Sequence, residues 1–589
     1  MTSLYRLLLL VLIAGCAQQA VVSDTNESTA DTRLTALYER EWEWRQDQQG
    51  YMRAADGDWQ PKDRLPSVTP EAYAAQLNYW EAALAELADI PMAELSDEQR
   101  INAAVFEQII SSNASNIRFR TYEAPLNSDS FFWNGIAPRY AGFDDVAGYD
   151  RYIARMRDLP RYFDEHIANM RRGLERGYTP PAITLRGREK SIEPYLADGR
   201  DNPFFAPMNF FHPRIGDEER SRIEAESIDV INSFVAPAYA ELLQFMREEY
   251  LPNARTTLGA SELPDGAEFY RAQIREYTTL DLSPQEIHEQ GLAEVARIRD
   301  AMLAIIAEVE FDGDLRAFFE FLRTDPQFYA KSPEELMGLS AYVDKRMAAH
   351  LEDILGFLPR KRHTIAPVPD AIAPIYTAGR GGYGRCWMNT WNLSARPLYT
   401  IPALTLHECS PGHSLQFAIS REAPGEIPEF RARNYFSGYG EGWGLYTEWL
   451  GNELGIYRTP YERFGQLTYE MWRACRLVID TGVHEFGWSR EQALAYLRDH
   501  AALSDHEITT EVDRYISWPG QALAYKLGEM LIREKRAAAE AALGSNFDQR
   551  WFHDKILALR SVPLSVLADE LDRWIAAGGP DPYANLSAE

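Results

Sequence analysis

The chain has 589 residues, enough to bury a large core, and its 46% hydrophobic and 25% charged residues are typical of a soluble globular protein. Lysine and arginine total 60 and aspartate and glutamate total 88, which gives a formal net charge of −28. Because this charge repels a nucleic-acid backbone and the sequence shows no basic patch, we expect no nucleic-acid partner.

The first sixteen residues, MTSLYRLLLLVLIAGC, predict an export signal. One arginine precedes an apolar run of about ten residues, which is too short to span a bilayer permanently. The end of this run, Ile-Ala-Gly-Cys, resembles the bacterial lipobox, in which cleavage before the cysteine leaves a thiol that is lipidated. We therefore expect a signal peptide (1–15), a lipidated Cys16 and a flexible tether (16–30). A plain secretory signal is the alternative.

The residue after the cysteine also bears on localisation. By resemblance to the sorting rules of Gram-negative cells, Ala17 in place of aspartate favours the periplasmic face of the outer membrane. We expect contact with the membrane through the lipid anchor only. In that oxidising compartment the three remaining cysteines, Cys386, Cys409 and Cys475, can form one disulfide, whose pairing the sequence leaves open.

Amphipathic helical periodicity dominates the rest of the chain. Apolar residues recur at i, i+3, i+4 and i+7 in four long stretches: 70–90, 147–177, 283–310 and 459–577. Strand-like sequence is scarce, and the best of it lies at 363–399, where β-branched and aromatic residues alternate with Gly and Pro. Since no linker or repeat interrupts residues 31–589, we predict one mainly α domain with one small β-sheet before residue 407.

Residues 407–413 read HECSPGH and predict a zinc site. Many zinc hydrolases begin their metal site with His-Glu and a second histidine, but the usual spacing is H-E-x-x-H. Positions i and i+6 of a regular helix lie about 120° apart, so His407 and His413 could not share an ion. Pro411 and Gly412 remove this objection, because proline lacks an N–H and glycine tolerates unusual dihedral angles. We expect a bulge there that returns both imidazoles to one face.

Catalytic zinc needs a third protein ligand and an open position for water. The glycine-rich segment SGYGEGWGLYTEWL (437–450) supplies two candidates on one helix face. We predict Glu441 as the third ligand and keep Glu448 as the alternative, or as a partner that orients a histidine. Glu408 cannot bind the ion beside its neighbour but can act as general base toward the metal-bound water.

A later stretch, TTEVDRYISWPGQALAYKLGEM (509–530), offers polar groups around a Trp-Pro-Gly break. Tyr515 is the predicted catalytic donor to the oxyanion that forms during amide hydrolysis. Four neighbours are candidates for contact with a peptide substrate, including its terminal carboxylate: Arg514, Gln521, Tyr525 and Lys526.

Five segments together resemble the bacterial domain-of-unknown-function family DUF885: HECSPGH, GEGWGLYTE, ACRLVIDTGVHEFGWSREQALAYL (474–497), EVDRYISWPGQALAYKLGE (511–529) and FDQRWFHDKIL (547–557). The resemblance spans nearly all of the mature chain. It implies a large, helical, zincin-like (gluzincin) domain with a deep cleft, distantly similar to carboxypeptidases and angiotensin-converting enzyme. Four residues match the expected metal ligands and base of that family: His407, His413, Glu441 and Glu408.

The Arg514-Tyr515 pair is similar to one in angiotensin-converting enzyme, whose tyrosine stabilises the oxyanion. We therefore expect a lipid-anchored zinc metallopeptidase, of carboxypeptidase or dipeptidase type, acting on small peptides. Two alternatives remain. The segment GHSLQ (412–416) resembles the G-x-S-x-G nucleophile elbow and would make Ser414 the nucleophile of an esterase, although Gln416 replaces its last glycine. The other alternative is a non-catalytic, peptide-binding lipoprotein.

Overall fold

The computed structural model describes residues 29–137, 142–370 and 372–584. The predicted signal peptide and Cys16 lie outside these ranges. Helix α1 (Ala30–Gln48) begins at the last residue of the predicted tether, where the Thr29 hydroxyl accepts a hydrogen bond from the Thr32 N–H. Within the described ranges, no helix combines the length and the apolar character that crossing a membrane requires.

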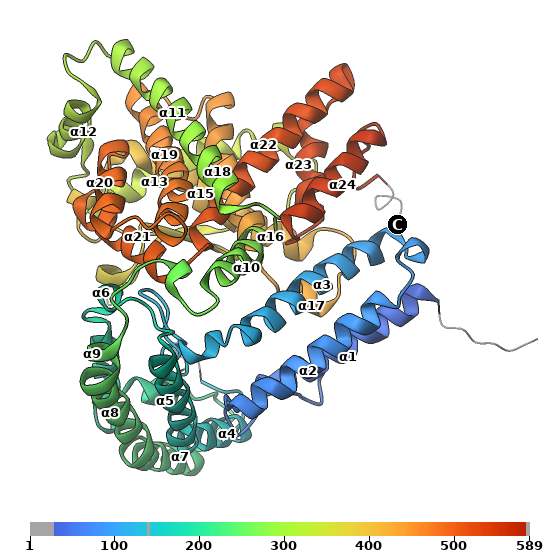
Figure 1. The fold of residues 1–589 in the computed structure, drawn as a ribbon, viewed down its shortest axis with the longest axis vertical. Helices are drawn as coiled ribbons and strands as arrows, with labels where there is room; N and C mark the ends of the chain where they lie inside the picture. Colours follow the sequence, from blue (N-terminus) through green and yellow to red (C-terminus); the bar gives the residue numbers. More distant parts are fainter. Residues whose placement is uncertain (1–28, 138–141, 371, 585–589) are drawn as a thin grey trace, which may run out of the picture.

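Three long helices form an N-terminal layer, drawn in blue in Figure 1. They are α1, α2 (Pro70–Ala88) and α3 (Asp97–Arg118). Helix α2 starts where the sequence predicts, because Thr69 caps its first turn and Pro70 fits the first helical position. The layer packs on the rest of the molecule through one continuous apolar core that runs from α1 to α24.

A second sheet, which the sequence analysis did not anticipate, follows α1. Strands β1 (Tyr51–Arg53) and β2 (Trp59–Pro61) pair antiparallel. The turn between them contains Gly57, whose φ of 91° lies in the region that favours glycine. Strands of three residues are too short for their side-chain alternation to stand out in the sequence.

The next helices, with residues 131–137 packed into the same apolar core, form a separate lobe at the lower left of Figure 1, here called the aromatic lobe (residues 131–137 and 142–254). Its helices are α4 (Val146–Arg157), α5 (Leu159–Arg176), α6 (Ala182–Leu185), α7 (Asp217–Val230), α8 (Ala236–Phe245) and α9 (Leu251–Asn253). The single helix predicted over 147–177 divides at Asp158, because Pro160 lacks the N–H that would continue it.

The remaining helices build the upper body of the molecule, except α17, which packs against α1 and α3 (Figure 1). They are α10 (Gly266–Thr278), α11 (Pro284–Glu308), α12 (Leu315–Thr324), α13 (Pro333–Ala348), α14 (Leu351–Ile354), α15 (Ile401–Glu408), α16 (His413–Glu422), α17 (Glu429–Ala432), α18 (Ser437–Glu453), α19 (Pro460–His484), α20 (Arg490–His500), α21 (Asp505–Ser517), α22 (Ala524–Leu543), α23 (Gln549–Ala558) and α24 (Leu564–Ala576). Helix α11 packs along α19 and α18 along α22. The prediction of a mainly α protein is confirmed.

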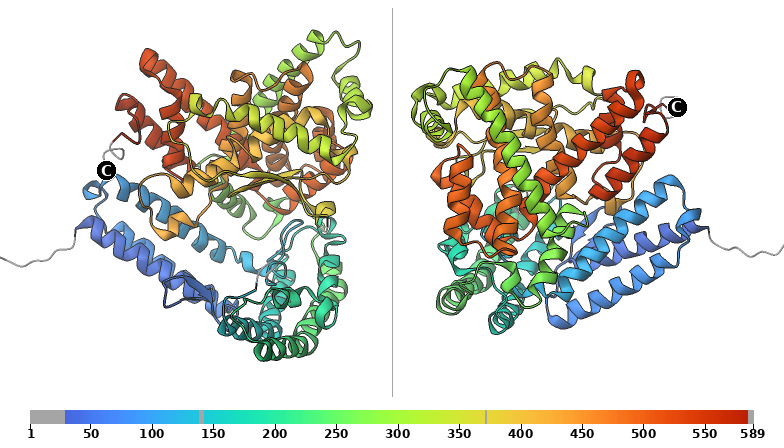
Figure 2. Two further views of the ribbon diagram at one scale, coloured as in Figure 1. Left: turned by 180° about the vertical axis from the view of Figure 1, so that it is seen from behind. Right: turned by 45° about the horizontal axis from the view of Figure 1, so that its top comes forward.

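A three-stranded sheet lies directly before the HECSPGH segment, as predicted, and crosses the middle of the molecule in yellow in the left view of Figure 2. Its strands, in spatial order, are β3 (Thr364–Pro367), β5 (Arg385–Met388) and β4 (Gly379–Gly382). Strand β5 pairs parallel with β3 and antiparallel with β4. The edge strand β4 packs against both α15 and α16, so the sheet supports the helices that carry the histidines.

Candidate metal centre

The HECSPGH segment is a junction between two helices. Helix α15 ends at Glu408, α16 begins at His413, and residues 409–412 connect them with a cis peptide bond between Ser410 and Pro411. The helix is therefore interrupted at the predicted place. It is a complete break with a new start, however, and not the expected bulge within one helix.

Backbone contacts hold the second helix close to the first. The Gly412 N–H donates to the Leu406 carbonyl oxygen at 3.0 Å. A Cβ atom on Gly412 would lie 1.9 Å from the His407 carbonyl oxygen, so no side chain fits at this position. The close approach of the junction to α15 places His413, the first residue of α16, beside His407 near the end of α15.

Three side chains from α15, α16 and α18 converge on one point. Glu441 Oε2 lies 3.3 Å from His407 Nε2 and 3.4 Å from His413 Nε2. The two imidazole rings are nearly perpendicular, with an interplanar angle of 87°. Metal–ligand bonds of about 2.0–2.1 Å at tetrahedral angles separate ligand atoms by about 3.3–3.4 Å. These two separations equal those between neighbouring ligands of a tetrahedral zinc ion, and three protein ligands would leave a fourth position for water.

Glu448 lies behind the first histidine. Its Oε1 is 2.8 Å from His407 Nδ1, the nitrogen that does not face Glu441, and its side chain is fully buried. Arg473 Nη2 approaches the same oxygen at 3.6 Å. A carboxylate on the outer nitrogen fixes the ring orientation and leaves the other nitrogen for a metal ion. Of the two roles considered for Glu448, the geometry matches the orienting partner and not the third ligand.

Glycines in α18 permit this approach. Helix α18 begins at Ser437 and contains these glycines. A Cβ atom on Gly444 would lie 2.7 Å from His407 Cε1, and one on Gly442 would lie 2.6 Å from the backbone of Gly528 in α22. Because these glycines have no side chain, α18 can contact the His407 imidazole on one side and α22 on the other.

The carboxylates of Glu441 and Glu448 strongly favour a positive charge on the groups between them. Burial disfavours the charged form of His407, but its contacts with Glu441 and Glu448 outweigh this and raise its pKa to about 10. Burial also disfavours the ionised form of Glu441, yet the charge of His413 and the bond to His407 hold its pKa well below the usual range. Either protons on the imidazoles or a bound metal cation can balance the negative charge of these carboxylates.

Glu408 is held beside the cluster by the edge strand. Its Oε2 accepts a hydrogen bond of 2.6 Å from the Gly381 N–H in β4, and it follows His407 directly in the chain. The carboxylate is partly exposed, whereas both histidines are buried. This position suits a group that exchanges protons with a molecule next to the cluster.

Ser414 does not have the surroundings of a nucleophile. It lies in α16 and follows helix α15, whereas a nucleophile elbow follows a buried strand. Its hydroxyl donates to the Glu408 carbonyl oxygen at 2.9 Å and accepts from the Gly382 N–H at 3.2 Å, and the side chain is 1% exposed. The esterase alternative is therefore wrong in its structural premise, because this serine ties α16 to α15 and β4.

Tyr515 is fully buried between α19 and α21. Its hydroxyl accepts hydrogen bonds from Trp472 Nε1 at 2.8 Å and Arg476 Nε at 3.1 Å. Burial raises the pKa of this hydroxyl above its usual range. Its O–H is hydrogen-bonded to the Glu511 carboxylate as well, so the donor and both acceptor positions of the hydroxyl are used by packing partners, as in a structural tyrosine.

The four predicted substrate contacts separate into two environments. Arg514 Nη2 donates to Gln521 Oε1 at 2.7 Å and to the Tyr525 hydroxyl at 3.3 Å, so these three form one cluster in which Arg514 and Tyr525 are partly exposed and Gln521 is buried. Lys526 instead lies fully buried, with its ammonium group contacting three carboxylates at 2.7–2.9 Å: Glu294, Glu470 and Glu529. The predicted substrate role of Lys526 is corrected, because these carboxylates occupy its three donors.

Tyr435, which the sequence analysis did not single out, borders the cluster. Its hydroxyl lies 3.5 Å from Glu441 Oε1, and the residue is 44% exposed. It belongs to the connection between α17 and α18, where no motif marks it. Neither of two cavities of about 720 and 460 Å³ is lined by His407, His413 or Glu441, so the expected deep cleft stays a prediction.

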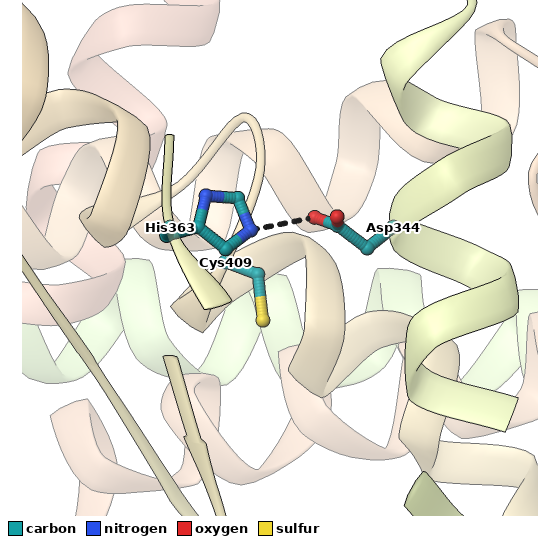
Figure 3. Close-up of side chains that lie close together, drawn as sticks. All are labelled: Asp344, His363 and Cys409. Carbon is teal, nitrogen blue, oxygen red and sulfur yellow. Dashed lines mark hydrogen bonds and ion pairs between the residues drawn. The ribbon is translucent and has the colours of Figure 1, made fainter. Parts of the chain in front are cut away.

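A second group of potential ligands lies near the same junction (Figure 3). His363 Nε2 is 3.0 Å from Asp344 Oδ1, and Cys409 lies close to both. Cys409 is bonded to Cys386, however, so it offers no thiolate to a metal ion. This disulfide links β5 to the residue after α15, and Cys475 remains a buried free thiol. The pairing that the sequence left open is thereby defined.

The fold and the site together define a mainly α protein with a buried two-histidine, one-glutamate cluster. The chain belongs to the family described as bacterial protein of unknown function (DUF885), whose profile matches residues 47–571. No curated protein matches the chain.

Two solved structures share the fold. One, from Colwellia psychrerythraea and provisionally described as a lipoprotein, is 24% identical, with a TM-score of 0.83, and the match covers 93% of this chain and 100% of that one. The other, from Shewanella oneidensis, is provisionally described as a lipoprotein of unknown function. It is 17% identical, with a TM-score of 0.67 and coverage of 92% and 99%.

Proposed function

We propose that this protein is a zinc-dependent peptidase of the bacterial cell envelope, which hydrolyses small peptides. The observation that carries the proposal is the placement of His407 Nε2 and His413 Nε2 at 3.3 and 3.4 Å from Glu441 Oε2, the spacing of tetrahedral zinc ligands. Zinc bound by this set would polarise a carbonyl group and lower the pKa of a bound water.

The residues around this set supply the remaining steps. Glu448 fixes the His407 ring, and Glu408, anchored by the Gly381 N–H, takes the proton of the attacking water. The same carboxyl group then gives that proton to the leaving amine. A purely structural histidine cluster would have no use for a partly exposed carboxylate beside it.

Two neighbouring groups are the candidates for substrate contact. The Arg514 guanidinium, held by Gln521 and Tyr525, is a partly exposed cation suited to a peptide carboxylate. The exposed Tyr435 hydroxyl, next to Glu441, is better placed than Tyr515 to donate to an oxyanion.

A lipid anchor at Cys16 would hold the enzyme at the envelope. The lipobox-like sequence supports this, and so do the provisional descriptions of both similar structures as lipoproteins. In this account the anchor restricts the enzyme to peptides that reach the periplasmic face of the outer membrane.

The proposal is tested with a mixed peptide library and mass measurement of the products. We expect hydrolysis by the purified protein, inhibition by o-phenanthroline and no inhibition by a phosphonate that inactivates serine enzymes. Glu408→Gln should reduce turnover by about 10²–10⁴-fold, because it removes the general base. Glu426→Gln, the same change at an exposed carboxylate, is the control. Full activity of Glu408→Gln, or hydrolysis that persists after chelation, would contradict the proposal.

A further inference from the structure

A cavity of about 460 Å³ lies away from the His-Glu cluster, where α10 and the end of α21 meet the loops that lead into the aromatic lobe. This volume falls within the range of small-molecule sites. Segments from four separate parts of the chain line it: 116–132, 178–181, 255–277 and 516–519. No function described above uses this space.

Aromatic side chains supply much of the lining. They are Phe131, Phe132, Tyr178, Phe269, Tyr277 and Trp518. Two of them are locked together, because Trp518 Nε1 donates to the Tyr277 hydroxyl at 2.6 Å. Aromatic faces attract cations and pack well against an alkyl or aryl body.

One carboxylate in this lining has only neutral partners. Glu276 Oε2 accepts hydrogen bonds from Asn116 Nδ2 at 2.9 Å and Gln273 Nε2 at 3.3 Å. Within the described residues Glu276 forms no ion pair with a lysine, arginine or histidine. Burial raises the pKa of this carboxyl, as expected where no cation compensates its charge. A ligand cation would gain from this uncompensated charge.

The lining also contains a cation, Arg255, whose donors are directed at the protein backbone and not into the cavity. Arg255 donates from Nε to the Thr179 carbonyl at 2.6 Å, from Nη1 to the Gly259 carbonyl at 2.8 Å and from Nη2 to the Leu258 carbonyl at 3.2 Å. Its guanidinium is therefore directed at backbone oxygens, and it ties neighbouring loops together. Glu276 is left as the carboxylate that determines which charge the cavity accepts.

We propose that this cavity binds the ammonium group of an organic amine, with Glu276 as its counter-charge and the aromatic side chains around its apolar body. The proposal depends on the cavity and not on the metal centre. It therefore holds or fails independently of the proposed peptidase activity.

Isothermal titration with hexylamine and with hexanol tests this site on the full protein. We expect saturable 1:1 binding of hexylamine and at least tenfold weaker binding of hexanol, which has the same alkyl body without the charge. This comparison on the unmodified chain needs no variant to fold. Equal affinity for the two compounds, or no saturable binding of hexylamine, would overturn the proposal.

A pair of variants locates the binding site. Glu276→Gln keeps a hydrogen-bond acceptor for Asn116 and Gln273, and it should lower hexylamine affinity at least tenfold with little effect on hexanol. Glu268→Gln makes the same change on the exposed face of α10 and should leave both affinities unchanged. Unaltered hexylamine binding by Glu276→Gln would place the amine elsewhere and reject the site.

Discussion

Two buried histidines, one in the aromatic lobe and one in the candidate metal centre, have opposite surroundings. His166 stacks on Phe132 with ring centroids 4.0 Å apart, neither ring nitrogen has a hydrogen-bond partner among the residues that the structure describes, and burial lowers its pKa to about 3. His407 is equally buried but meets Glu441 and Glu448, and its pKa is raised to about 10. Burial alone therefore does not distinguish a candidate metal ligand from a histidine of the core. The carboxylates that converge on His407 are what distinguish it from His166.

The same contrast extends to the two regions. The aromatic lobe is held by apolar side chains such as Trp133, Phe163 and Tyr239, all fully buried. The candidate metal centre instead buries ionisable groups, which stabilise a fold less than apolar residues of similar size. We infer that the aromatic lobe contributes mainly to the free energy of unfolding, whereas the candidate metal centre lowers it and serves the proposed reaction. The following variants test this difference between the two regions.

The largest expected effect is loss of the metal ion. His413→Ala removes one of three ligands, so dialysed protein should contain essentially no zinc, against about one ion per chain in the unmodified protein. His166→Ala, the same change at the buried histidine of the lobe, should retain its zinc. Elemental analysis by mass spectrometry measures both. Full zinc content in His413→Ala would remove this residue from the ligand set.

A large loss of stability is expected from the lobe. Trp133 is fully buried, and its Nε1 donates to Ser191 Oγ at 3.0 Å. Trp133→Ala should lower the free energy of unfolding by about 3–5 kcal/mol while zinc content stays unchanged. Trp391→Ala, at a tryptophan that is 46% exposed, should change it by less than about 0.5 kcal/mol. Urea unfolding measures these free energies. Loss of zinc in Trp133→Ala would contradict the inference that the aromatic lobe provides stability and does not affect metal binding.

Removal of the disulfide should have a somewhat smaller effect. The Cys386–Cys409 bond joins residues 23 apart in the sequence, a loop whose closure stabilises the folded state by about 3 kcal/mol in the chain-entropy model. The double variant Cys386→Ser/Cys409→Ser should lose up to that amount, and the unmodified protein should lose it when dithiothreitol is added. Insensitivity of the unmodified protein to dithiothreitol would argue against the bond.

The smallest effect is expected from the residue behind His407. Glu448→Gln weakens the contact with Nδ1 but leaves the ligand set intact, so zinc affinity should fall by about 10–100-fold. Glu453→Gln, an exposed carboxylate in the last turn of the same helix, should leave it unchanged. Competition with a chelating dye measures both affinities. If Glu448→Gln binds zinc as tightly as the unmodified chain, the orienting role is incorrect.

Local sequence signals predicted the parts that local chemistry determines. The cap Thr69 and Pro70 mark the start of α2, and Pro411 with Gly412 marks the break between α15 and α16. The sequence could not separate Glu441 from Glu448, because both lie on one face of α18. Which imidazole nitrogen each carboxylate meets depends on how α18 packs against α15.

Contacts between distant segments escaped prediction for the same reason. Two of the three carboxylates around Lys526 come from α11 and α19, so the amphipathic pattern of its own helix gave no sign of its burial. Tyr435 is only six residues from Glu441, but it precedes α18, so no helical periodicity placed it beside that carboxylate. Pairing of Cys386 with Cys409 likewise requires β5 to lie under α15.

Anomalous X-ray diffraction at the zinc edge, on crystals of the unmodified protein, tests the central claim most directly. The account predicts one strong peak about 2.0–2.2 Å from His407 Nε2, His413 Nε2 and a carboxylate oxygen of Glu441. A zinc-soaked crystal without a peak between these three side chains, or with its peak at Asp344 and His363, would contradict it.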